Sequence, residues 1–187
     1  MYIIPGYSMM AATATTFMLS IIFLLLSEQS KKQYMRFWGI SWLVYSAMFL
    51  LDFCHLNWDF IYLGYVMLRQ MLALLGAYTF LLGTHHFFQT KYPASLGFAA
   101  ILSTISMSLY PAISPVYTLM IIPNIIFSSG LLIYSGCMFI AISWTQKLPE
   151  KLIASFLIIL WSIFINHFAF SLKNQQLEIG SYYISIF

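Results

Sequence analysis

Few side chains in this sequence can do chemistry, and four of them fall within long apolar segments: Asp52, Arg69, Asn124 and His167. Ionisable and amide groups are costly inside a membrane, where they pair with one another or mark a ligand or ion site. Arg69, Asn124 and His167 lie about 8–13 Å from the same end of their segments at the rise of a helix, and Asp52 lies closer to that end. We expect these four side chains to line a cavity that opens outward and senses a small molecule or a lipid, with Gln70 and Asn166 as further candidates.

A purely structural interpretation of the same residues stays open. Asp52 and Arg69 carry opposite charges and can form an ion pair that fixes the register of two helices. Asn124 follows Pro123 and can bond the carbonyl that a proline leaves without a donor in a kinked helix. Pro123 is also a candidate hinge in the long fifth segment.

We expect no catalytic residue, cofactor or metal site in this chain. It has five Asp and Glu in total, and it lacks H-E-x-x-H, G-x-S-x-G and a Gly-rich phosphate loop. Cys54 and Cys137 fall at different depths, which precludes a disulfide between them. His55, expected in the loop after the second segment, and His167 could in principle ligate haem, but no C-x-x-C-H is present. A lone membrane histidine more often forms a hydrogen bond than ligates haem. Because the catalytic signatures are missing, we expect no enzymatic activity in this chain.

The composition indicates whether this protein is surrounded by water or by lipid. Its 187 residues are 61% hydrophobic and 7% charged, with a mean hydropathy of +0.87, whereas charged residues make up roughly 25% of soluble domains. So few charges exclude soluble enzymes, secreted disulfide scaffolds and nucleic-acid binders. The sequence therefore predicts an integral membrane protein.

The apolar segments predict an all-α bundle of six transmembrane helices in a single domain, 1–187. The six segments are 8–26, 37–54, 60–83, 95–110, 116–144 and 152–172. Residues 181–187 are also apolar, but as a helix they would span only about 10 Å. We expect them to begin a seventh helix in a chain truncated before a cytoplasmic output domain; a short tail on the outer face is the alternative.

Basic residues predict the orientation. With the N-terminus outside, the cytoplasmic loops hold Lys31, Lys32, Arg36, Lys91, Lys147 and Lys151, and the external side holds Lys173. Cytoplasmic loops of membrane proteins carry such an excess of Lys and Arg. We therefore expect a multi-pass protein of the plasma (inner) membrane with its N-terminus outside.

Three stretches carry a resemblance to a known class. Residues 36–46 read Arg-Phe-Trp-Gly-Ile-Ser-Trp-Leu-Val-Tyr-Ser, residues 77–88 end in Thr-His-His-Phe-Phe, and residues 145–151 form a short basic loop. This layout resembles the N-terminal multi-helix membrane region of bacterial sensor histidine kinases and diguanylate cyclases, over most of the chain, as a pattern without a diagnostic motif. The resemblance implies that the chain relays a membrane or extracellular signal to a cytoplasmic module that it does not contain. It also implies a homodimer formed through that module. Independently of the resemblance, we expect the bilayer and a small-molecule or lipid ligand as partners, and no nucleic acid.

Two other classes stay open. A small-solute transporter, or its substrate-binding subunit, fits the size and an outward polar cavity. However, the sequence has no repeated half and no pair of broken helices of the kind that surround a midplane site. A structural subunit of a membrane complex is the third class.

Overall fold

The computed structural model describes residues 3–57, 62–92, 94–109, 117–146 and 149–174. Within these ranges the side chains of some residues, among them 117–123 and 164–174, are not described. The predicted start of a seventh helix at 181–187 lies outside the described residues.

The described residues form six α-helices and no strand, which confirms the all-α prediction. The helices are α1 (Ile3–Ser30), α2 (Gln33–Asn57), α3 (Tyr62–Phe87), α4 (Ala94–Leu109), α5 (Tyr117–Gln146) and α6 (Pro149–Asn174). Each contains most of one predicted segment, and most are a few residues longer. The difference arises because the prediction ended each segment where apolar residues stop, whereas polar residues such as Gln29 and Ser30 continue the helix.

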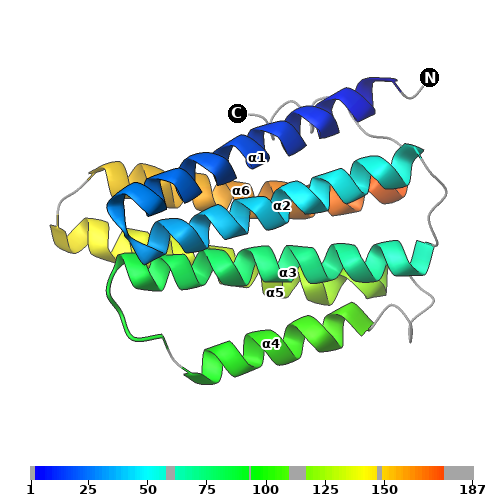
Figure 1. The fold of residues 1–187 in the computed structure, drawn as a ribbon. Coiled ribbons are helices and arrows are strands. Elements are labelled where there is room, and N and C mark those ends of the chain that lie inside the picture. The colour runs from blue at the N-terminus through cyan, green and yellow to red at the C-terminus, as the bar shows by residue number, and fades with distance from the viewer. Residues whose placement is uncertain (1–2, 58–61, 93, 110–116, 147–148, 175–187) are drawn as a thin grey trace.

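The helices run up and down, and α3 lies at the centre of the bundle (Figure 1). It packs against α2, α4 and α5, while α1 packs on α2 and α6 packs on α5. The end of α1 and the start of α2, the end of α3 and the start of α4, and the end of α5 and the start of α6 all lie at the left-hand end of Figure 1. We call this the basic end, because the described side chains Lys31, Lys32, Arg36, Lys91 and Lys151 belong to it; the other end is the opposite end.

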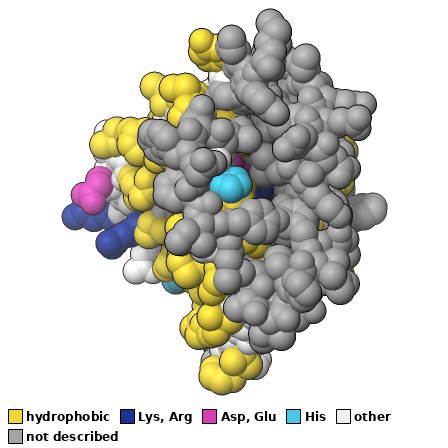
Figure 2. Space-filling model, turned by 90° about the vertical axis from the view of Figure 1, so that its right-hand side faces the viewer, with side chains coloured by type: hydrophobic (Ala, Val, Ile, Leu, Met, Phe, Trp, Pro, Cys, Tyr) yellow, Lys and Arg dark blue, Asp and Glu magenta, His cyan; other side chains and the backbone are white. Residues whose placement is uncertain are grey.

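Four helices contain stretches long and apolar enough to cross a membrane: Met9–Ser30, Gln33–His55, Gly64–Phe87 and Asn124–Ser143. Large apolar side chains point outward from the bundle, for example Met18, Phe98 and Phe156, each about two-thirds exposed. The described flank of the molecule is accordingly mostly hydrophobic in Figure 2. Such a surface is stable against lipid tails and not against water, which supports a membrane protein.

The core lies where α2, α3 and α5 meet. Its buried members include Tyr45, Met48 and Phe49 of α2, Leu81 of α3 and Leu132 of α5.

Small residues let α2 and α3 approach closely. A Cβ atom at Gly76 would lie 2.9 Å from the Tyr45 ring, and the Ser41 hydroxyl donates a 2.8 Å hydrogen bond to the Gly76 carbonyl. Helix packing in membranes depends on such small residues and interhelical hydrogen bonds, because lipid tails are as apolar as the side chains.

Candidate functional site

Asp52 of α2 and Arg69 of α3 form a buried ion pair, as the sequence predicts. The Arg69 Nε atom donates a hydrogen bond of 2.9 Å to Asp52 Oδ1, and the two side chains are 8% and 0% exposed. The helices are antiparallel and consecutive, so the residues near the end of α2 and the start of α3 lie at similar depth. Neither charge could stay buried alone without a large desolvation penalty, and the pair therefore fixes the register of α2 against α3.

Tyr65 completes the pair, and sequence reasoning missed it. Its hydroxyl donates a 2.8 Å hydrogen bond to the same oxygen, Asp52 Oδ1. Tyr65 lies one helical turn before Arg69, so the two side chains project from one face of α3. This spacing was the available signal. The second carboxylate oxygen, Asp52 Oδ2, is buried and accepts no hydrogen bond within the described part of the chain.

His55 extends the site toward the opposite end of the bundle. Its ring stacks on Tyr65, with ring centroids 3.8 Å apart and planes 10° apart. It lies in the last turn of α2 and not in the loop where the apolar boundary placed it. We call His55, Tyr65, Asp52 and Arg69 the Asp52 cluster. Figure 2 views the bundle from this end.

Asn124 of α5 connects a third helix to the same region. Its side-chain amide donates a 3.0 Å hydrogen bond to the backbone carbonyl of Gln70 on α3, and it is only 4% exposed. The described hydrogen bond thus leads to a neighbouring helix and not to the carbonyl freed by Pro123 within α5. Because Gln70 follows Arg69, adjacent residues of α3 bond to α2 and to α5.

Three of the predicted residues have side chains outside the described part of the chain: His167 and Asn166 on α6, and Pro123 on α5. Pro123 falls within the helix α5, and its role as a hinge stays a prediction. The side chains that the structure does bring together are Asp52 and Arg69, with Asn124 bonded one residue further along α3.

Metal-binding chemistry has no support in the described residues. No group of three His, Cys, Asp or Glu side chains among them is placed to hold a metal ion. Cys54 and Cys137 are both free thiols.

The arrangement is suited to binding and switching. Asp52 and Arg69 are buried and paired with each other, and the predicted outward cavity stays a prediction. A ligand cation or proton could compete with Arg69 for Asp52, and a ligand anion could compete with Asp52 for Arg69.

Fold and composition together define an all-α membrane protein with at least four candidate membrane helices. Comparisons with protein family models, with curated proteins and with solved structures gave no match.

Proposed function

We propose that this chain is the sensory input region of a bacterial signal-transduction protein of the histidine kinase or diguanylate cyclase type. It receives a membrane or extracellular signal and relays it to a cytoplasmic kinase or cyclase module outside this chain. The observation that carries the proposal is the Asp52 cluster together with the adjacent Gln70–Asn124 hydrogen bond. These contacts connect a half-buried histidine near the opposite end with three packed helices.

The proposed relay has two states. In the closed state Arg69 is bonded to Asp52. A signal that separates the pair leaves two buried charges without a partner. Because an unpaired buried charge is costly, both side chains move toward other polar groups, and α3 shifts relative to α2. Because Gln70 accepts a hydrogen bond from Asn124, a shift of α3 also acts on α5, and α5 packs on α6. A signal can drive this change only by the difference in its affinity for the two states.

We further propose that all six helices cross the inner membrane, with the N-terminus outside and the basic end in the cytoplasm. The charges of the described residues support this orientation, since the basic end carries five Lys and Arg side chains against Glu28 and Glu150. An excess of basic residues marks the cytoplasmic side. A homodimer would form through the cytoplasmic module.

The first test is the reading frame beyond codon 187. An in-frame continuation through a seventh helix into a kinase or cyclase module is the expected result. A stop codon directly after Phe187 would contradict the sensor proposal and favour a small-solute transporter or an accessory subunit.

The second test measures the relay itself. Spin labels at positions 91 and 150, both exposed at the basic end, report the distance between the α3–α4 connection and α6 in a variant without Cys54 and Cys137. Asp52→Asn should shift the distance distribution or add a second population. Glu28→Gln is the matched control, because it also removes one carboxylate charge but from an exposed position. Identical distributions for wild type and Asp52→Asn would contradict the relay.

A further inference from the structure

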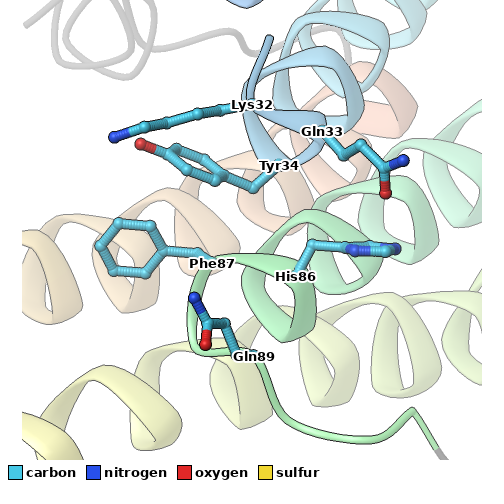
Figure 3. A pocket seen from close by; sticks show the side chains of 6 residues that line it. All are labelled: Lys32, Gln33, Tyr34, His86, Phe87 and Gln89. Atoms are coloured by element: carbon cyan, nitrogen blue, oxygen red, sulfur yellow. The ribbon is translucent and has the colours of Figure 1, made fainter. Parts of the chain in front are cut away.

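A pocket of about 370 Å³ lies at the basic end, between the α1–α2 turn and the end of α3. Six side chains line it: Lys32, Gln33, Tyr34, His86, Phe87 and Gln89. Figure 3 shows Lys32 and Tyr34 extending to one side, Gln33 and His86 extending to the other, and Gln89 below. None of the lining residues is acidic.

The position of the pocket in the membrane is defined by the ends of three candidate spans. One span ends at Ser30, the next begins at Gln33, and the third ends at Phe87. The pocket therefore lies where the apolar stretches stop, which is the depth of the lipid headgroups rather than of the hydrocarbon core. A phospholipid phosphate lies at this depth in every bilayer.

The lining combines the chemistry of a phosphate with that of a lipid. Lys32 supplies a positive charge, and the Tyr34 hydroxyl, which extends to the same side in Figure 3, can donate a hydrogen bond to an anionic oxygen there. Gln33 and His86 bring further donors to the other side of the lining, and Gln89 brings one below. The exposed Lys31, Arg36 and Lys91 add positive charge at the same end. Tyr34 and Phe87 supply apolar rings that glycerol and acyl carbons can contact.

The walls of the pocket are held in place before any ligand binds. The Tyr34 and Phe87 rings meet edge to face at 5.0 Å, and His86 stacks on Phe37 at 5.0 Å. The Lys32 ammonium lies 5.9 Å from the centre of the Tyr34 ring. Lys31 and Gln89 adopt positive φ values of 54° and 53°, which turn the chain sharply after α1 and α3 and bring the two turns together.

We propose that this pocket binds the phosphate group of an anionic phospholipid in the leaflet at the basic end. Basic pockets between transmembrane helices bind anionic headgroups through this chemistry. The bound lipid would lie between the α1–α2 turn and α3, and it would stabilise the bundle at the end remote from the Asp52 cluster. The proposal requires a membrane protein but does not depend on the sensory function.

The test uses the full chain in a neutral detergent, titrated with phosphatidylglycerol or phosphatidylcholine, with bound lipid counted by native mass spectrometry. Phosphatidylglycerol should bind one to one and more tightly than phosphatidylcholine. Lys32→Gln should weaken phosphatidylglycerol binding about fivefold, the usual contribution of one basic residue near anionic lipid. Lys91→Gln removes the same charge at the same end but outside the pocket, and it should weaken binding less than Lys32→Gln does. Equal losses for the two variants would overturn the proposal.

A second variant separates binding from folding. Gln33→Glu places a carboxylate in the first turn of α2, which favours the helix but repels a phosphate in the pocket. It should keep or raise the melting temperature and still lose affinity for phosphatidylglycerol. Binding equal to wild type would overturn the proposal.

Inorganic phosphate distinguishes a lipid from a soluble ligand. It is added to protein already loaded with phosphatidylglycerol, at a matched concentration. The lipid should stay bound, because its acyl chains contact the bundle as well. Release of the lipid by inorganic phosphate would overturn the assignment to phospholipid.

Discussion

The contact between α2 and α3 is made in two different ways along its length. Toward the opposite end it depends on the Asp52–Arg69 pair and the Tyr65 hydroxyl, three side chains that meet at one oxygen atom. Toward the basic end it depends on aromatic rings around Trp38. That ring has neighbours on α1, α2, α3 and α5, namely Phe23, Tyr34, Phe80, Phe87 and Phe139.

The two regions should respond differently to perturbation. Many ring contacts share the stabilisation at the basic end, so the loss of one changes little. At the Asp52 cluster one atom carries the interaction, and its removal leaves a buried charge. The rings around Trp38 are thus suited to hold the helices together, and the Asp52 cluster is suited to change state.

The largest expected effect comes from breaking the ion pair. Asp52→Ala leaves the Arg69 charge buried without its carboxylate and should lower the free energy of unfolding by about 3–5 kcal/mol. Equilibrium unfolding in mixed detergent micelles measures it. The charge-swapped double variant, Asp52→Arg with Arg69→Asp, should be more stable than the sum of the effects of Asp52→Arg alone and Arg69→Asp alone predicts. If those two single effects simply add, the pair does not stabilise the bundle.

Removal of the Tyr65 hydroxyl should cost less. Tyr65→Phe keeps the ring on His55 but removes a hydrogen bond to a charged acceptor, which corresponds to about 1.5–3 kcal/mol. The same unfolding assay measures it, with Tyr134→Phe as the control at an exposed tyrosine. Equal effects of the two changes would mean that the hydroxyl of Tyr65 contributes nothing specific.

The packing around Trp38 can be tested by adding a methyl group next to its ring. A Cβ atom at Gly83 would clash with Trp38 Cδ1, so Gly83→Ala must displace the ring and should destabilise by about 1–3 kcal/mol. Gly130 on α5 has no atom within 4 Å of such a Cβ. Gly130→Ala should therefore stabilise by about 0.5–1 kcal/mol, because alanine favours a helix over glycine. Opposite signs in thermal unfolding are expected, and equal signs would argue against the close packing on Trp38.

The smallest effect is expected at the bond between α3 and α5. Asn124→Ala removes one hydrogen bond to the Gln70 carbonyl, and interhelical bonds of this kind contribute about 0.6 kcal/mol in membranes. The loss in stability should therefore be small. The change should nevertheless alter the response of the spin-label distances to Asp52→Asn, because it disconnects α5 from the Asp52 cluster. In the Asn124→Ala background, Asp52→Asn should no longer shift those distances. A shift that persists there would place the relay elsewhere.

The sequence predicted the helices and the ion pair because each follows from a strong, local physical requirement. Long apolar stretches must be helical in a membrane to satisfy their backbone groups. Asp52 and Arg69 are opposite charges at similar depth on consecutive antiparallel helices, and pairing is the least costly arrangement for both.

The remaining contacts had weaker signals. Tyr65 looks like any other aromatic residue near the end of a membrane segment. The partner of Asn124 is the backbone carbonyl of Gln70. Every residue carries such a group, so no residue pattern predicts this partner. The pocket at the basic end depends on the positive φ angles of Lys31 and Gln89, and neither residue type favours that conformation as glycine does.

The tight turn between α1 and α2 has a consequence for biosynthesis. Lys31 and Lys32 alone separate the two helices, which pack along each other. A connection this short cannot let one helix lie in the bilayer while the other remains in water. We therefore expect the translocon to release α1 and α2 together as one hairpin. The two lysines at its tip would then be retained on the ribosome side, and the direction of this hairpin would set the direction of every helix that follows.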